Sequence, residues 1–319
     1  MDLCSKISDA EKRIRPFILE TPLLRSNYLS SLNKGNTYLK LESEQHTGSF
    51  KARGALNKIL SLSKDDKENG LVTASTGNHA LGFSRALSVS GDKGAIYLPT
   101  NAVPSKVQAL EEYGVELNFH GEGCLDAELH AKRMAKERNM IWVSPYNDIE
   151  VMAGQGTIAC ELSRQLPNAD VVLACIGGGG MIGGIATWLK EKHTHVKIIG
   201  CLPENSPEMY LSVKKGEVVS LDEPLETLSD GSAGGLESDS ITFDICKELI
   251  DDYVLVSEGE IASAIRIVAN KHHKIIEGAA GVAVGAFIKL AKQLIGKNVA
   301  IVVCGSNIPI EKLTKILAE

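Results

Sequence analysis

Residues 49–55, Ser-Phe-Lys-Ala-Arg-Gly-Ala, place a single lysine, Lys51, where a loop meets a helix. Residues 38–42 before it alternate like a β-strand, residues 45–49 form a polar turn, and the apolar residues from 50 to 62 follow helical spacing. Lys51 therefore falls in the first helical turn, where unpaired N–H groups and the helix dipole disfavour a protonated amine. This placement suits an amine nucleophile, and the alternative is a solvated surface lysine.

The composition is that of a globular protein with a small-molecule partner. The chain has 319 residues, 44% of them hydrophobic and 23% charged, so it can bury a sizeable core. Its net charge of -6, without a cluster of Lys and Arg, argues against nucleic acid and membrane partners. The first residues lack the apolar core of a signal peptide and no apolar stretch could span a membrane, so we expect a cytoplasmic location. The seven cysteines are scattered without a C-x-x-C pair, which argues against disulfides and a zinc site.

Strand-like and helical segments alternate along the chain, which predicts an α/β fold with two doubly wound parallel-sheet domains. Residues 1–70 and 147–319 are predicted to form the larger domain, and residues 71–146 a smaller domain inserted into it. The first helix is expected over residues 9–20, with a break near Pro16. A polar loop is expected from about residue 203 to residue 240.

Residues 177–180 are four consecutive glycines between an apolar strand segment and a helical segment. Such a loop exposes backbone N–H groups beside a helix N-terminus and therefore predicts a phosphate site. The pattern Gly178-x-Gly180-x-x-Gly183, with Glu204 further on, also matches a dinucleotide fingerprint, so an NAD-dependent dehydrogenase is the main competitor. A turn that serves only packing is the weakest alternative, because four glycines cost backbone entropy.

Two further segments bring polar groups to strand ends. Residues 75–79, Ser-Thr-Gly-Asn-His, open a helix and offer backbone amides and polar side chains to a carboxylate, although a simple helix cap is an equal alternative. Cys304 ends the last predicted strand, at the edge where ligands of α/β proteins bind, and a buried inert thiol is its default interpretation. The histidine pairs 193/195 and 272/273 have no third ligand in spacing, so no metal site is expected.

These motifs, in this order, resemble the fold type II family of pyridoxal-phosphate-dependent serine/threonine dehydratases and serine racemases, which is similar to the tryptophan synthase β-subunit. The resemblance covers residues from about 21 to 308. It implies that Lys51 holds the cofactor covalently and that Lys51 and Thr76 are catalytic. The other cofactor contacts that it implies are Phe50, Asn78, Gly177, Gly178, Gly179, Gly180, Met181 and Cys304. The substrate contacts that it implies are Ser75, Thr76, Asn78 and His79.

Two positions depart from the racemase pattern. Thr76 stands at the place of a catalytic serine, so racemisation is expected to be inefficient. Leu202 stands at the place of a metal-binding carboxylate, although Glu204 and Glu208 leave a displaced cation site open. Residues 229–235 and 277–281 resemble dehydratases of less usual hydroxyamino acids, of the hydroxyectoine-pathway or 3-hydroxyaspartate type.

The resemblance therefore implies an ammonia-lyase that uses pyridoxal phosphate to convert a β-hydroxy amino acid, such as L-threonine or L-serine, to a 2-oxo acid and ammonia. Lys51 would remove the Cα proton, and the neutral thiol of Cys304 would face the pyridine nitrogen. The alternatives are a serine racemase, a dehydratase of a less usual hydroxyamino acid, an NAD-dependent dehydrogenase and a phosphate-ligand binding protein. The expected partners are the amino acid substrate and a second copy of the chain in a homodimer.

Overall fold

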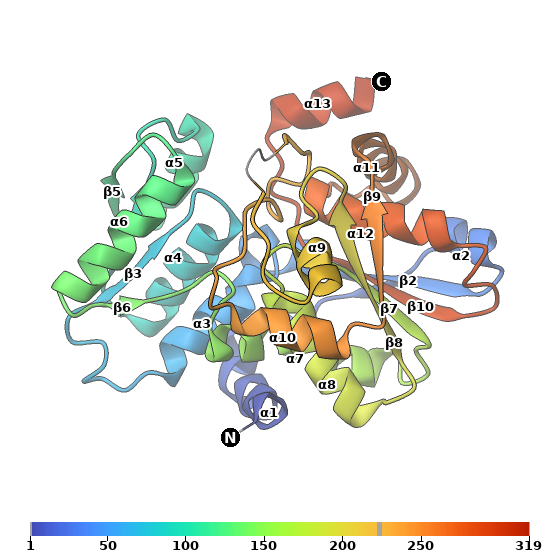
Figure 1. Cartoon of the computed structure of the whole chain (residues 1–319), viewed down its shortest axis with the longest axis horizontal. Coiled ribbons are helices and arrows are strands. Elements are labelled where there is room, and N and C mark those ends of the chain that lie inside the picture. The colour runs from blue at the N-terminus through green and yellow to red at the C-terminus, as the bar shows by residue number, and fades with distance from the viewer. Residues whose placement is uncertain (1, 222–224, 319) are drawn as a thin grey trace.

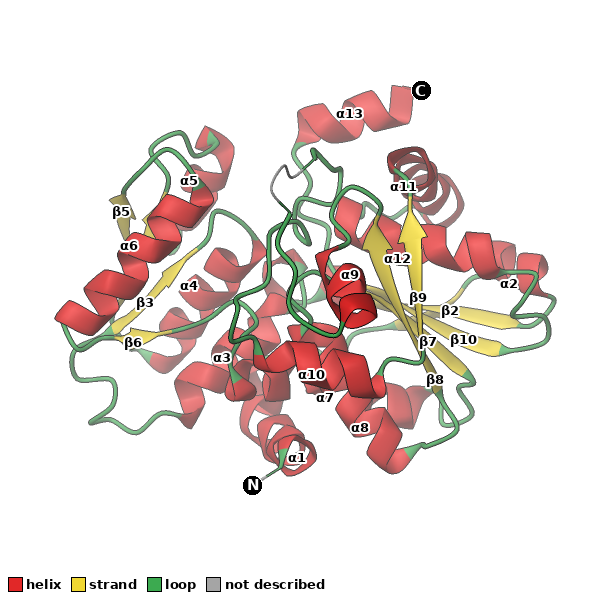
Figure 2. Ribbon diagram, in the orientation of Figure 1, coloured by secondary structure: helices red, strands yellow, loops and turns green. Residues whose placement is uncertain are grey.

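The computed structural model describes residues 2–221 and 225–318, which form two β-sheets flanked by helices (Figure 1 and Figure 2). The larger sheet has six strands in the order β1-β2-β10-β7-β8-β9, and only the β1-β2 pair is antiparallel. These strands are β1 (Leu23–Arg25), β2 (Asn36–Leu41), β7 (Val171–Cys175), β8 (Lys197–Pro203), β9 (Asp252–Val256) and β10 (Asn298–Val303). The smaller sheet has four parallel strands in the order β5-β4-β3-β6. These are β3 (Leu71–Ala74), β4 (Gly94–Leu98), β5 (Glu116–Phe119) and β6 (Ile141–Trp142).

Helices pack on both sheets. On the larger sheet, α12 lies against β7, β8 and β10, and α8 lies against β7. The helices of this part are α1 (Leu3–Ile14), α2 (Asn27–Asn33), α7 (Ile149–Gln165), α8 (Gly180–Lys192), α9 (Glu208–Lys215), α10 (Ile241–Leu249), α11 (Glu258–His272), α12 (Gly278–Leu290) and α13 (Ile310–Ala318). Around the smaller sheet are α4 (Asn78–Ser90), α5 (Pro104–Glu111) and α6 (Cys124–Glu137).

Helix α3 (Lys51–Ser61) connects the two sheets. It packs against both α4 and α7 and lies between the sheets in Figure 2. Its Leu56 and Ile59 are buried and share an apolar core with Leu71 and Ile96 of the smaller sheet. The helix that begins with Lys51 is therefore held by both parts of the molecule. The division of the chain into domains at residues 71 and 146 stays a prediction.

The central strands of the larger sheet bring two of the predicted motifs to one edge. All five residues of β7 are buried, as expected for a parallel strand covered on both faces. β7 and β10 are parallel neighbours, with Ile301 opposite Leu173. The glycines that follow β7 and Cys304, which follows β10, therefore lie at the same carboxyl edge of the sheet.

The predicted α/β alternation is confirmed, but the first helix begins earlier than predicted. Helix α1 starts at Leu3 because Asp2 caps it, accepting a hydrogen bond from the Ser5 N–H at 2.8 Å. It ends at Ile14, and the chain continues as a 3-10 turn over Arg15–Phe17, since Pro16 has no N–H for the next helical bond.

The loop predicted between residues 203 and 240 contains a helix that the sequence pattern did not reveal. Helix α9 lies within it and ends at Gly216, whose φ of 88° is the left-handed conformation that glycine adopts most easily. Its apolar anchor is Met209, which is 1% exposed. A single buried apolar side chain does not produce the helical periodicity from which a helix can be predicted in the sequence.

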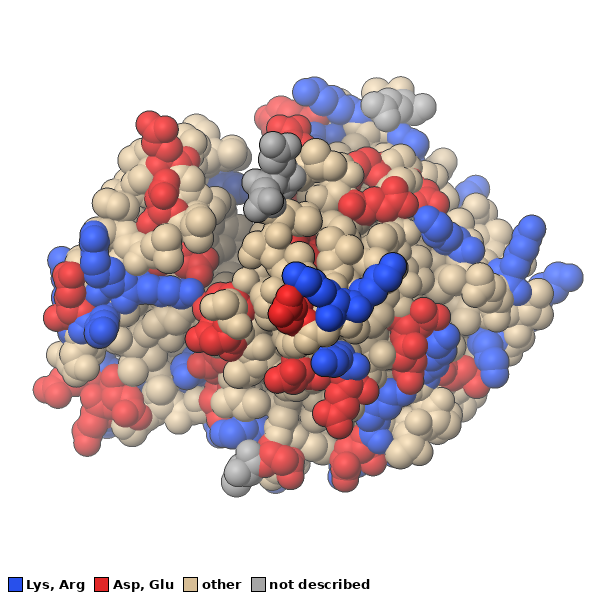
Figure 3. Space-filling view, in the orientation of Figure 1, with Lys and Arg blue, Asp and Glu red and all other residues tan. Residues whose placement is uncertain are grey.

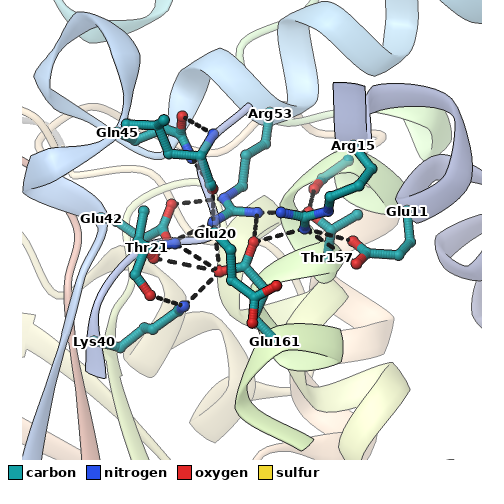
Figure 4. Close-up of polar contacts among 12 residues, drawn as sticks. Glu11, Arg15, Glu20, Thr21, Lys40, Glu42, Gln45, Arg53, Thr157 and Glu161 are labelled. Atoms are coloured by element: carbon teal, nitrogen blue, oxygen red, sulfur yellow. Dashed lines mark hydrogen bonds and ion pairs between the residues drawn. The ribbon is translucent and has the colours of Figure 1, made fainter. Parts of the chain in front are cut away.

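A group of buried charges fixes α3 to the larger sheet. We define the buried ion cluster as Lys40, Glu42, Arg53 and Glu161, whose side chains are all fully buried. The Arg53 guanidinium donates to Glu42 at 2.7 Å and to Glu161 at 2.8 Å (Figure 4). Lys40 forms an ion pair with Glu161, and Arg15 reaches the same carboxylate at 2.7 Å. The cluster therefore joins β2, α3 and α7 two residues beyond Lys51.

Charged side chains of both signs are interspersed over the face drawn in Figure 3. This face shows no large area of a single sign. None of the helices in the described residues combines the length and the hydropathy that a membrane span requires.

Candidate active site

A cavity enclosing about 530 Å³, part of it open to solvent, lies where the carboxyl ends of β7 and β10 meet the first turns of α3, α4 and α8. All the residues predicted to contact the cofactor line it, namely Phe50, Lys51, Asn78, Gly177, Gly178, Gly179, Gly180, Met181 and Cys304. The structure thus gathers segments that are far apart in the sequence around one space.

Lys51 is the first residue of α3 and has an unusual environment for a lysine. Its N-cap residue, Phe50, makes no side-chain capping bond, and the Phe50 N–H donates a hydrogen bond to the Cys304 carbonyl at the end of β10, at 3.0 Å. The Lys51 amine donates to the carbonyl of Pro145 at 2.6 Å. Burial lowers the pKa of Lys51 from 10.5 to about 8, against the opposing pull of Cys304 and Glu277. A neutral, nucleophilic amine is therefore accessible near neutral pH.

The glycines at residues 177–180 form a loop into which side chains would not fit. A Cβ at Gly178 would lie 2.3 Å from the ring of Tyr146, and one at Gly177 would lie 2.8 Å from the carbonyl oxygen of Ser232. Gly179 has a φ of 83°, which strains any residue with a side chain. No side chain caps α8, so the N–H groups of its first turn remain available to a ligand. The loop is an anion cradle at a helix N-terminus.

Glu277 is a buried acid in the cavity wall that the sequence did not assign to the site. Its carboxylate accepts hydrogen bonds from the Asn78 side-chain amide at 2.9 and 3.0 Å and from the Asn307 N–H at 3.2 Å. Burial nevertheless raises the pKa of Glu277 to about 7. Its segment, residues 277–281, was recognised in the sequence, but no local pattern indicates that the carboxylate faces a cavity rather than solvent.

Cys304 lies beside Glu277, with Sγ 3.8 Å from Oε1. Burial and the neighbouring carboxylate raise the pKa of the Cys304 thiol well above 9.0. The thiol is therefore neutral at physiological pH. Cys175 also lines the cavity, and burial raises its pKa to about 12.

The residues predicted to bind the substrate are only partly brought to the cavity. Asn78 lines it, whereas Ser75, Thr76 and His79 do not. Ser75 accepts a hydrogen bond from the Gly77 N–H at 3.2 Å within the turn. A Cβ at Gly77 would meet no atom within 4 Å, so the turn borders open space. The role of this turn in substrate binding stays a prediction.

His79 is 3% exposed and its Nε2 lies 3.0 Å from the carbonyl of Val143. Burial, followed by the charge of Lys51, lowers the pKa of His79 to about 3, so the ring is neutral. Its ring holds the start of α4 against the segment that follows β6.

The positions considered for a cation are engaged elsewhere. Leu202 is buried, Glu208 accepts from the hydroxyl of Ser206 at 2.7 Å, and Glu204 lies 3.7 Å from the amine of Lys289. Within residues 2–221 and 225–318, no three His, Cys, Asp or Glu side chains are grouped as metal ligands.

Tyr146 and Gln155 also line the cavity, although no local pattern in the sequence indicates them. The Tyr146 ring covers the glycine loop, and its hydroxyl accepts a hydrogen bond from the Glu237 N–H at 2.8 Å. Both partners are far from Tyr146 in the sequence, so only the folded chain reveals the contact.

The chain matches a family model described as pyridoxal-phosphate dependent enzyme over residues 14–305. It is 39% identical over 315 residues to a protein of Staphylococcus aureus strain N315 named L-threonine dehydratase catabolic TdcB, covering 98% of this chain and 90% of that protein. The structure of the processed form of threonine deaminase isoform 2 from Solanum lycopersicum matches with a TM-score of 0.93 at 32% identity, over 99% of this chain and 87% of the other. Serine racemase from Dictyostelium discoideum matches with a TM-score of 0.89 at 31% identity, over 96% and 98%.

The cavity fits the cofactor of this family. Lys51 offers an amine of lowered pKa, the glycine loop offers an anion cradle that any Cβ would obstruct, and Cys304 offers a neutral group. This fit replaces the alternative of a nicotinamide-binding loop. The family match covers far more than half of the chain, and the two sheets have the arrangement of its solved relatives. The chain therefore belongs to the pyridoxal-phosphate-dependent enzymes of fold type II.

Proposed function

We propose that this protein is an ammonia-lyase that converts L-threonine or L-serine to the corresponding 2-oxo acid and ammonia. The observation that carries the proposal is the Lys51 amine, with its pKa lowered to about 8, in the same cavity as the glycine loop. The substrate class is supported by the S. aureus relative, which is named a threonine dehydratase and aligns with nearly the whole chain.

Pyridoxal phosphate, when bound, supplies an electron sink that acidifies the Cα proton of an amino acid and allows a group on Cβ to leave. The N–H groups of residues 177–181 would hold its phosphate, and Phe50 and Asn78 would contact its ring. Cys304 would offer the ring nitrogen a neutral thiol, which would leave that nitrogen largely unprotonated.

Lys51 has two roles in this proposal. Its amine would hold the cofactor covalently and would act as the base that takes the Cα proton of the substrate. A lowered pKa serves both roles, because each needs the neutral amine. Residues 75–79 bind the substrate carboxylate through the first amides of α4 and through the side chains of Ser75, Thr76, Asn78 and His79.

Residues 71–146 act as the smaller, substrate-clamping domain in this proposal. Two ion pairs support it, because they cross from α5 and α6 to the loop before α10. Lys106 lies 3.3 Å from Asp230, and Lys132 lies 2.9 Å from Glu237. The protein acts in the cytoplasm as a homodimer, and its partner is a small amino acid.

The direct test is to supply the purified holoenzyme with L-threonine and L-serine and to measure ammonia and 2-oxo acid. Equal amounts of both products are expected, and Lys51→Ala is expected to make neither. Failure of every β-hydroxy amino acid tested, including those of the hydroxyectoine and 3-hydroxyaspartate type, would contradict the proposal.

An amino acid racemase is the second candidate, favoured by the match to the Dictyostelium serine racemase. Thr76 argues against it, since a β-branched hydroxyl is less free to return a proton to the opposite face of the substrate. Chiral analysis of the L-serine reaction separates the two, and D-serine forming faster than pyruvate would establish the racemase.

A further inference from the structure

Gln155, in α7, is a cavity residue whose amide group is only half satisfied. The side chain is 1% exposed, and its Oε1 accepts a hydrogen bond from the Gly54 N–H at 3.1 Å. Because the Gly54 N–H is a donor, the oxygen must face it, and this fixes the amide orientation. Nε2 is buried and has no hydrogen-bond partner within residues 2–221 and 225–318. An unpaired buried amide N–H group is costly, roughly 1–3 kcal/mol.

The backbone of α3 leaves space for the Gln155 amide. A Cβ at Gly54 would lie 2.2 Å from Nε2, so only glycine leaves room for the side chain at this point of α3. Gly54 is three residues beyond Lys51, in the same turn of α3. The Gln155 oxygen therefore takes the place of a cap for α3, while the NH₂ group of this cavity-lining side chain has no partner among the described residues.

Gln155 lines the same cavity as the phosphate cradle formed by residues 177–180. Its neighbour Gly156 packs against Gly184, since a Cβ at Gly184 would lie 2.8 Å from the Gly156 nitrogen. Gly184 is one turn beyond Gly180, where α8 begins. The segment of α7 that carries Gln155 thus packs on both α3 and the N-terminal part of α8, whose dipoles both favour a negative charge.

We infer that Gln155 donates a hydrogen bond from Nε2 to the phosphate of the cofactor, in addition to the backbone N–H groups of the glycine loop. This inference rests on the proposed cofactor site but not on the identity of the substrate. It gives Gln155 two linked functions: its oxygen holds the first turn of α3, and its nitrogen binds the anion. One amide therefore sets the spacing between Lys51 and the phosphate.

The test compares holoenzymes of the wild type, Gln155→Glu and a matched control, Asn57→Asp. Gln155→Glu keeps an oxygen for the Gly54 N–H but replaces the donor by an oxygen. Asn57→Asp makes the same chemical change in the same α3–α7 contact, where Nδ2 donates to the Glu150 carbonyl at 2.7 Å, away from the cavity. The measurements are the ³¹P signal of the bound cofactor and the rate at which cofactor is lost after dilution into cofactor-free buffer.

For Gln155→Glu we expect a moved ³¹P signal and cofactor loss about tenfold to a hundredfold faster, the size of effect of one hydrogen bond to a charged group. Asn57→Asp is expected to keep the wild-type signal and rate while its melting temperature falls. A wild-type signal and rate in Gln155→Glu would overturn the inference and leave Gln155 as a cap for α3. Since the substrate takes no part, this result is independent of the ammonia-lyase assay.

A measurement on the wild type covers the case in which Gln155→Glu does not fold. The ¹⁵N–¹H signal of the Gln155 side chain is compared between protein loaded with pyridoxal phosphate and protein loaded with pyridoxal, which lacks the phosphate. A large difference in this signal, with the signal of Asn57 unchanged, is expected. Identical Gln155 signals in the two forms would contradict the inference.

Discussion

The buried ion cluster and the active-site cavity both remove ionisable side chains from water. The cluster favours the charged forms of Arg53 and Glu161, whereas the cavity favours the neutral forms of Lys51 and Glu277. In the cluster, the guanidinium of Arg53 meets the carboxylates of Glu42 and Glu161, and these contacts hold the pKa of Glu161 well below its usual range (Figure 4). In the cavity, burial outweighs pairing. It lowers the pKa of Lys51 to about 8 and raises that of Glu277 to about 7.

This difference separates groups that stabilise the fold from groups that are ready to react. A buried charge with complete partners resists titration and ties its elements together. A buried ionisable group with incomplete partners has its pKa shifted in favour of the neutral form. A ligand that pairs with such a group stabilises it more than it would a fully paired one. Arg53 and Lys51 are two residues apart on α3, so one helical turn carries both kinds of group.

The largest effect is expected from breaking the cluster. Arg53→Met leaves two buried carboxylates facing each other without their shared cation, and removal of one partner of a buried ion pair costs about 3–5 kcal/mol. Urea unfolding at pH 7 measures the loss in unfolding free energy. As a control, Arg164→Met removes an exposed ion-pair partner of Glu20 and is expected to cost less than about 1 kcal/mol. Equal costs for the two variants would show that the cluster contributes no more than a surface pair.

The two regions should also respond oppositely to pH. Because the folded-state pKa of Glu277 is raised from 4.5 to about 7, its contribution to stability is complete below pH 4.5 and is lost as pH rises to 7. The full loss is about 3 kcal/mol. Because the pKa of Glu161 is lowered, its contribution is complete above pH 4.5 and is lost only in more acidic solution.

Unfolding of the cofactor-free protein between pH 3 and pH 8 tests this contrast. Glu277→Gln is expected to flatten the stability profile between pH 4.5 and 7 and to leave the acid limb unchanged. A profile for Glu277→Gln that parallels the wild type across this window would mean that Glu277 titrates like an exposed acid.

The smallest effect on stability is expected at Lys51. Its lowered pKa means that the buried amine costs stability below pH 8, and that this cost disappears as pH rises toward 10.5. Lys51→Met is therefore expected to stabilise the cofactor-free protein at pH 7 by about 1 kcal/mol, a value discounted because the side chain is partly exposed. The gain should vanish near pH 10.5. Destabilisation by several kcal/mol would place Lys51 among the structural charges instead.

The sequence predicted those parts of the fold and the site that depend on local pattern. Lys51 at a loop-to-helix boundary and the glycines at 177–180 are recognisable because a few adjacent residues define each. The α/β alternation could be predicted because it too depends on local sequence pattern. Helix α9 was missed because Met209 is its main buried anchor.

Long-range partners were not predictable. Arg53 and Glu161 are 108 positions apart, and Asn78 and Glu277 are 199 apart. No single segment indicates that such side chains meet, or that Gln155 lies against Gly54 in the wall of the cavity. The groups that set the pKa of the site are therefore visible only once the two sheets are packed around α3.

We propose that Lys51 is the residue that holds pyridoxal phosphate. The most direct measurement is reduction of the holoenzyme with borohydride, which fixes the cofactor on its lysine, followed by peptide mapping. We expect the modified peptide to contain residues 49–55 with the added mass on Lys51. Modification of another lysine, or cofactor bound without any covalent attachment, would contradict it.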